Sequence, residues 1–249
     1  MPKFNLSNDM QVLVPPGAGA FQFSAIRPEN LGATEYTLVT IELDTTGSVD
    51  PYADELLKAV IAAIDACKKS PRAENLLMRF VNFNSVSGIS EKHGFKLLST
   101  LDMNDYAKPK CDGMTPLWDA TFDSINATLH YSKTLKDQDF GVNGIIFVIT
   151  DGDENASRIS TPVSIKKRLE DAKKSEVIES LITVLVGINT QNCKTLLENF
   201  QIKAGLTQFV DIGSATPQRL AKLAAFVSKS VSSQSQAIGT GAASQPLNF

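Results

Sequence analysis

Residues 36–48 read Tyr36-Thr37-Leu38-Val39-Thr40-Ile41-Glu42-Leu43-Asp44-Thr45-Thr46-Gly47-Ser48, a β-branched apolar run that stops abruptly at an aspartate. Such a run is apolar enough for a central strand buried on both faces of a sheet. A second run, residues 144–150, has the same character and ends at Asp151-Gly152-Asp153. The two longest apolar strands that we predict therefore both end in an aspartate followed by small polar residues.

Helices are expected between strands along the rest of the chain. After the first run, apolar residues at helical spacing predict a helix over residues 52–69. We expect further strands at 76–83, 95–99, 181–188 and 208–212, and further helices at 116–135, 162–175, 193–200 and 216–231. This alternation predicts an α/β fold that is doubly wound, with a mostly parallel central sheet flanked by helices. In such sheets, ligands bind beyond the carboxyl ends of the strands.

The two ends of the chain differ in composition from the middle. Residues 1–34 contain several Gly and Pro residues and predict an N-terminal arm with one short strand at 21–26. Residues 232–249 are rich in Ser, Gln, Gly and Ala, which predicts a flexible C-terminal tail. We therefore expect one domain over residues 35–231 between these two segments.

Composition narrows the classes of function. The 249 residues carry a formal net charge of −3, which gives no electrostatic reason to bind nucleic acid or an anionic membrane. The apolar runs are far shorter than a membrane helix needs, and the first residues lack the pattern of a signal peptide. Three scattered cysteines suit a reducing compartment. We expect a soluble, cytoplasmic protein.

Oxygen-bearing side chains gather at the two strand ends. Asp44, Thr46 and Ser48 alternate, and Gly47 allows the tight turn that aims their oxygens at one point. Asp151 follows the second strand, and Thr115 lies directly before the helix expected at 116–135. Carboxylates and hydroxyls are hard ligands that suit Mg²⁺ or Mn²⁺ better than zinc. The pattern predicts a divalent-cation site.

These residues resemble the von Willebrand factor A (vWA) domain and its metal-ion-dependent adhesion site (MIDAS). The resemblance rests on Asp44-x-Thr46-Gly47-Ser48, on Thr115 in its Gly-x-Thr-Pro-Leu context, and on Ile149-Thr150-Asp151-Gly152. It covers residues 35–230, and the three motifs occur in the expected order. One departure is Thr46, where the family commonly has serine; the hydroxyl is kept.

The resemblance implies one cation, Mg²⁺ or else Mn²⁺ or Ca²⁺, at the top of a doubly wound sheet. Ser48 and either Thr46 or Thr115 would bind it directly, and Asp44 and Asp151 would bind directly or through water. A sixth position would stay open for an Asp or Glu of a protein partner. We expected Asp44 and Asp151 to lie at exposed strand ends, so that their substitution would spare the fold.

Neighbouring charged residues have simpler interpretations. We assign Asp119 a structural role in the first turn of its helix. Asp153, Glu154 and Asn155 are interpreted as a solvated loop, Trp118 as core or rim packing, and His93 as a surface residue in a turn.

Three functions are open at this point. The first is a non-enzymatic binding module, an adaptor that grips an acidic partner or another copy of itself; intracellular proteins that resemble the family include adaptors beside AAA-type ATPases. The second is a metal-dependent phosphatase or phosphotransferase, against which position 46 is Thr and the nearest lysines are Lys108 and Lys110. The third is a metal-stabilised structural or assembly protein whose ends make the contacts.

Overall fold

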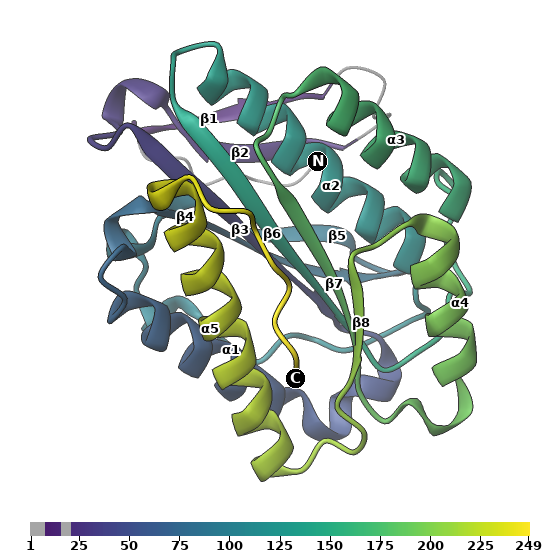
Figure 1. Cartoon of the computed structure of the whole chain (residues 1–249). Helices are drawn as coiled ribbons and strands as arrows, with labels where there is room; N and C mark the ends of the chain where they lie inside the picture. The colour runs from purple at the N-terminus through teal and green to yellow at the C-terminus, as the bar shows by residue number, and fades with distance from the viewer. Residues whose placement is uncertain (1–7, 16–20) are drawn as a thin grey trace.

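The chain folds around one eight-stranded sheet, seen in a computed structural model that describes residues 8–15 and 21–249 (Figure 1). The strand order is β1-β2-β5-β4-β3-β6-β7-β8. The strands are β1 (Met10–Leu13), β2 (Phe23–Ile26), β3 (Glu35–Asp44), β4 (Leu76–Asn84), β5 (Gly88–Leu97), β6 (Gly141–Thr150), β7 (Leu181–Gly187) and β8 (Gln208–Asp211). The five strands β4, β3, β6, β7 and β8 run parallel, so their carboxyl ends share one edge.

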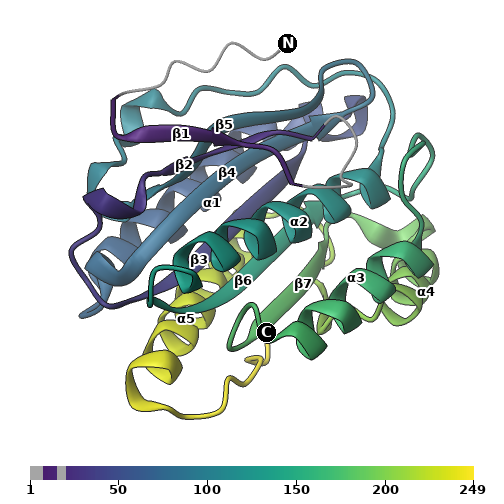
Figure 2. The same ribbon diagram turned by 90° about the horizontal axis from the view of Figure 1, so that it is seen from above.

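Helices cover both faces of the sheet, and the sheet separates α2 and α3 from α1 and α5 when seen from above (Figure 2). The helices are α1 (Ala53–Lys68), α2 (Leu117–Lys136), α3 (Pro162–Ser175), α4 (Lys194–Ala204) and α5 (Pro217–Thr240). None of the helices in the described part of the chain is long and apolar enough to span a lipid bilayer. The doubly wound, mostly parallel fold predicted from the alternating pattern is confirmed.

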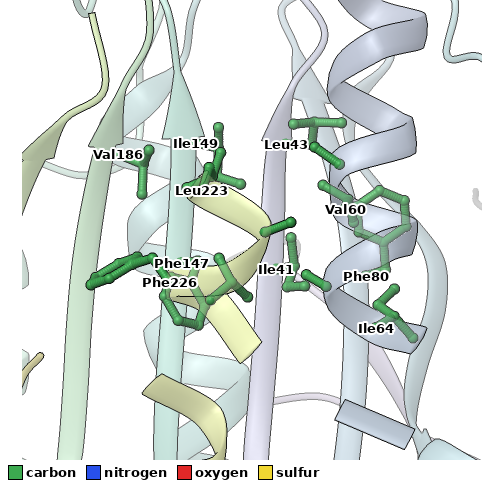
Figure 3. Packing of buried hydrophobic residues seen from close by; sticks show 14 of the residues in the cluster. Ile41, Leu43, Val60, Ile64, Phe80, Phe147, Ile149, Val186, Leu223 and Phe226 are labelled. Carbon is green, nitrogen blue, oxygen red and sulfur yellow. The ribbon is translucent and has the colours of Figure 1, made fainter. Parts of the chain in front are cut away.

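Side chains of the central strands point alternately to the two faces of the sheet and build an apolar core on each face. Ile41 and Leu43 of β3 point to the face covered by α1 and α5, where they meet Val60 and Leu223 (Figure 3). The opposite face packs Ile146 and Val148 of β6 and Leu117 and Ile125 of α2. Both faces of the central strands are therefore buried, which explains the continuous apolar runs in the sequence.

The second half of the β4–β5 hairpin differs from our prediction. Residues 88–97 form one strand, β5, antiparallel to β4, and not a turn followed by a short strand at 95–99. His93 is therefore a strand residue whose Nε2 lies 2.5 Å from the Tyr106 hydroxyl, and the surface-turn interpretation was wrong. Its apolar alternation is weak because many of its residues are polar, and one of them, Glu91, has its side chain buried by an ion pair with Arg79.

The N-terminal region contributes strands to the sheet. β1 pairs antiparallel with β2, and β2 pairs in parallel with β5 through Ala25 and Phe95. A Cβ added at Gly94 would lie 1.8 Å from the carbonyl oxygen of Ser24, so only glycine permits this approach. Residues 1–7 and 16–20 of the predicted arm lie outside the described residues.

Helix α5 continues beyond residue 231, where we predicted the tail to begin. The helix ends at Thr240. Polar residues of the extension make hydrogen bonds inside the fold; for example, the side-chain amide of Gln234 donates to the carbonyl of Gly144 at 3.1 Å. The last residues run back beside α5 toward β8 (Figure 1), where Phe249 packs edge-on against Phe226. Composition alone misplaced this boundary.

A buried ion cluster joins α2 to β4 and β5. The Arg79 guanidinium donates to Glu91 and to Asp123, each at 2.8 Å, and all three side chains are at most 5% exposed. Ser124 donates to Glu42 at 2.7 Å beside them. Burial raises the pKa of Glu42 well above its ordinary value, and Asp123 adds to the rise. We call Glu42, Arg79, Glu91 and Asp123 the Arg79 cluster.

Candidate metal centre

The loop after β3 folds back on its own aspartate. The backbone N–H of Thr46 donates to one Asp44 carboxylate oxygen at 2.8 Å, and the Thr150 hydroxyl donates to the other at 2.6 Å. Asp44 is only 1% exposed, so our expectation that it lies at an exposed strand end was wrong. Thr150 ends β6, the strand that pairs with β3, and the parallel pairing is what brings the two strand ends together.

Three oxygen atoms form a continuous chain at this edge. Thr46 Oγ1 and Ser48 Oγ are 3.1 Å apart, and Ser48 Oγ donates to Asp151 Oδ1 at 2.8 Å. Neighbouring ligands of an octahedral Mg²⁺ ion at 2.0–2.1 Å are separated by about 2.9 Å. The spacing of these oxygens therefore fits adjacent positions around such an ion.

Thr115 reaches the same place from the loop before α2. Its backbone N–H donates to the side-chain oxygen of Asn155 at 2.7 Å, and its carbonyl accepts from the Asn155 N–H at 3.1 Å. A Cβ added at Gly152 would lie 3.2 Å from Thr115 Oγ1, which places this hydroxyl against the residue after Asp151. All five predicted ligands, Asp44, Thr46, Ser48, Thr115 and Asp151, thus border one edge of the sheet.

Residues that hold the loops were missed in the sequence. Glu154 accepts hydrogen bonds from the backbone N–H groups of Trp118, Ala156 and Ser157. Together with Asn155, it ties the loop after β6 to the start of α2. Both residues lie in a loop as expected, and Asn155 is exposed, but their hydrogen bonds also give them a structural role. Nothing in the sequence distinguishes such residues from ordinary loop residues, because the partners that they reach before and at the start of α2 are 36 and 40 positions away.

Asp119 and Trp118 behave as expected. The Asp119 carboxylate accepts from the N–H groups of Arg158, Ile159 and Ser160, which makes it structural. Trp118 packs against the core beneath α2 and α3, with its ring 6.4 Å from that of Phe200.

The electrostatics of the edge favour an added cation. Burial raises the pKa of Asp44 to about 7, although hydrogen bonds from Thr150 and Thr46 oppose the rise. Among the described residues, no Lys or Arg forms an ion pair with Asp44 or Asp151. A positive charge placed here would favour the ionised form of both carboxyls.

Tyr52 adds an unsatisfied polar atom at the same edge. Its hydroxyl is buried and makes no hydrogen bond of ordinary geometry within the described residues, although Asp151 and Asn189 lie near it. Burial raises its pKa, and the charge of Asp151 raises it further, which places the phenol near that carboxylate. A water molecule on a bound ion could satisfy such a hydroxyl.

The oxygen atoms at this edge match the ligands that divalent cations prefer. The five predicted ligands offer two carboxylates and three hydroxyls, whereas no three His, Cys, Asp or Glu side chains cluster as a metal site within residues 8–15 and 21–249. Two carboxylates neutralise a divalent ion without surplus charge, and oxygen ligands suit Mg²⁺, Mn²⁺ or Ca²⁺. The residues therefore fit the cation that the resemblance implies.

Comparison with known proteins supports the fold alone. No family model matches the sequence, and no curated protein matches it by sequence. Among solved structures, proximal thread matrix protein 1 from the mussel byssus is 16% identical with a TM-score of 0.54, over 80% of this chain and 47% of that protein. The PilB minor pilin from Streptococcus sanguinis is 15% identical with a TM-score of 0.52, over 84% and 64%.

A third structure is the vWF domain of the pilus tip protein Mfa5 from Porphyromonas gingivalis. It is 12% identical with a TM-score of 0.51, over 87% of this chain and 99% of that domain. The chain thus has a vWA-like fold. It spans less than two thirds of the length of the mussel and streptococcal proteins. One structure of the mussel protein, with a TM-score of 0.51, has a zinc-occupied MIDAS motif.

Proposed function

We propose that this chain is a protein-binding module that holds a divalent cation, Mg²⁺ in the first instance, at the edge where β3 and β6 end. The observation that carries the proposal is the oxygen chain from Thr46 through Ser48 to Asp151, with spacings of 3.1 and 2.8 Å. When bound, the ion would supply an open position for one more carboxylate, contributed by an acidic side chain of a protein partner.

The residues of the chain divide the work of binding. Ser48, with Thr46 or Thr115, would supply neutral oxygens, and Asp44 and Asp151 would supply the compensating negative charge. Because the hydroxyls add no charge, the ion stays attractive to a further anion, whereas a cage of four carboxylates would saturate it. Thr150 and Asn155 orient these groups through hydrogen bonds to Asp44 and Thr115.

We favour binding over catalysis because of where the lysines lie. Phosphoryl transfer calls for a cation near the transferred phosphate. Lys108 instead lies 3.4 Å from Asp50, and Lys110 lies 4.0 Å from Asp112 with its side chain 86% exposed. The position two residues after Asp44 is Thr46, which lacks a second carboxylate.

We also keep the expectation of a reducing compartment, since Cys67, Cys111 and Cys193 are free.

The first test measures metal binding directly. We expect calorimetric titration with Mg²⁺ or Mn²⁺ to show one site in the wild-type protein and none in Asp151→Asn. The matched control is Asp153→Asn, which removes a carboxylate from the same loop and is expected to bind like wild type. Equal binding by Asp151→Asn and wild type would overturn the proposed site.

The second test separates partner capture from a purely structural ion. Immobilised wild-type protein is exposed to extract of its source cells with Mg²⁺ or EDTA. We expect a captured protein to depend on Mg²⁺ and on Asp151, and to be lost when one acidic residue of the captured protein is neutralised. An ion that raises stability while capture ignores it would favour a metal-stabilised structural protein instead.

A further inference from the structure

The apolar side chains left exposed in this molecule are unevenly distributed. Eight large apolar side chains are exposed in the described residues, and five of them lie on loops or first helical turns at the edge that carries the oxygen chain. We call these five the apolar rim: Val86, Met114, Ile159, Val163 and Leu196. Exposed apolar residues that gather around a polar site are typical of an interaction surface.

One side of the rim is a rigid apolar pair. Ser85 donates its N–H to the carbonyl of Met114 at 2.8 Å, and Ser85 Oγ accepts from the Met114 N–H at 2.8 Å. Val86 and Met114 are therefore held close together, yet they are 64% and 53% exposed. Two exposed apolar residues on loops that are bonded to each other offer neighbouring apolar area to a partner.

This pair adjoins the proposed metal ligands. The carbonyl of Gly113 accepts from the N–H of Gly47 at 3.4 Å, and Gly47 lies between Thr46 and Ser48. Met114 also directly precedes Thr115. A side chain bound at the pair would therefore belong to a residue close in sequence to one bound at the ion.

The opposite side of the rim is tied to Asp151 and to α2. Cys193 Sγ donates to the carbonyl of Asp151 at 3.6 Å, and the N–H of Leu196 donates to the carbonyl of Cys193 at 2.9 Å. Ile159 is fixed by its N–H bond to Asp119 at 3.0 Å, and Val163 follows in the first turn of α3. The rim thus has apolar groups on both sides of the oxygen chain.

We propose that the apolar rim binds a protein segment in which the acidic residue is flanked by large apolar residues. This inference rests on the proposed function and specifies its partner. The argument is complementarity. A bound ion leaves one position for a carboxylate, and the uncharged side chains of Val86 and Met114 beside it offer apolar contact. Burial of one aliphatic side chain there would tighten binding about ten-fold.

The test is selection from a displayed library of cyclic peptides that share a central glutamate with randomised flanking residues. Binding is carried out in Mg²⁺, and bound peptides are eluted with EDTA, so that only ion-dependent binders are recovered. We expect wild-type protein to enrich Leu, Ile, Met or Phe beside the glutamate. We expect the double variant Val86→Ser/Met114→Ser to lose that preference while it still binds Mg²⁺ in calorimetry.

The control variant is Ile202→Ser, which removes a 68% exposed apolar side chain from α4 outside the rim. It should enrich the same peptides as wild type. Ion-dependent peptides without apolar flanks, or an unchanged preference in the double variant, would overturn the inference and leave the proposed function standing. Recovery of no EDTA-eluted peptides at all would count against both.

Discussion

The chain handles acidic groups in two opposite ways. In the Arg79 cluster, Glu91 and Asp123 are buried and each meets the same guanidinium at 2.8 Å. At the edge where β3 and β6 end, Asp44 and Asp151 meet hydroxyl and amide donors instead. Both sets lie on or beside the central strands of one sheet, and the difference is that only the first includes a side chain that supplies positive charge.

The contrast shows that a cation-binding site lowers the stability of the protein while the ion is absent. A cluster that contains its own cation forms its ion pairs when the chain folds and needs no external ion. Burial raises the pKa of Asp44 to about 7, so keeping this carboxylate ionised without a cation costs stability until an ion arrives. The first cluster belongs to the fold and the second to an external ligand.

The largest effect should follow from breaking the internal pair. Replacement of Arg79 by Met leaves Glu91 and Asp123 buried without a counter-charge, and we expect a loss of about 3–5 kcal/mol in the free energy of unfolding. Urea denaturation at pH 7 measures it. Neutralising both acids as well, with Glu91→Gln and Asp123→Asn, should restore part of the loss; no restoration would mean that packing and not charge explains the effect.

The second effect concerns the open edge. Mg²⁺ at a hundred times its dissociation constant should stabilise the wild-type protein by about 2.7 kcal/mol, a gain read as a shift in thermal unfolding against EDTA. Asp44→Asn should lose this gain and yet unfold no earlier than wild type in EDTA, because it removes a buried charge, keeps an acceptor for the Thr46 N–H, and offers an amide N–H to the Thr150 hydroxyl, which can accept it. Unfolding of this variant in EDTA would place Asp44 with the structural acids.

The third effect concerns the pH dependence of stability and depends on His93, which belongs to neither set of carboxylates. Burial lowers the pKa of His93 to about 4, and the positive charges of Lys96 and Arg79 add to this. Because the unfolded chain takes up the proton near pH 6.5, the contribution of His93 to stability should fall as pH drops from 6.5 to 4, by about 1 kcal/mol per pH unit. Asp44, with its raised pKa, contributes with the opposite sign over the same window, so the effect is measured as the difference between wild type and His93→Gln at each pH. That difference should change with pH over the window; a constant difference would mean that His93 does not contribute to the acid sensitivity.

The smallest effect should come from an ion pair near the surface. Arg72 pairs with Glu35, and their side chains are 24% and 28% exposed. Solvent screening limits such pairs, so Arg72→Met should cost less than about 1 kcal/mol in urea denaturation. A loss as large as that of Arg79→Met would show that burial does not explain the contrast between the two arginines.

Much of the fold could be predicted because the central strands are buried on both faces. The runs at 36–43 and 144–150 need no tertiary knowledge, and α3 spans the predicted residues 162–175. β5 could not be predicted, since Glu91 is buried by an ion pair with Arg79 that no local pattern reveals. The extension of α5 was missed for the same reason, because Gln234 is polar and yet buried.

The candidate site divides in a similar way. Asp44, Thr46, Ser48, Thr115 and Asp151 could be proposed together because each follows a strand or precedes a helix, and strand ends of a parallel sheet meet at one edge. Their arrangement depends on Thr150, Glu154 and Asn155, whose partners come from other loops. The burial of Asp44 could not be predicted from the sequence either, since it depends on the pairing of β3 with β6, which brings Thr150 against the carboxylate.

The close approach of Ser24 to Gly94 has a consequence for the order in which the molecule is made. β2 is synthesised early, but the strand that it pairs with ends about seventy residues later, so the hairpin of β1 and β2 must wait. Until the β1–β2 hairpin pairs with β5, the outer edge of β5 presents unpaired amides and carbonyls to any extended chain nearby. The hairpin therefore acts during assembly as a cover for a strand edge, and a side chain at position 94 would leave that edge open to aggregation.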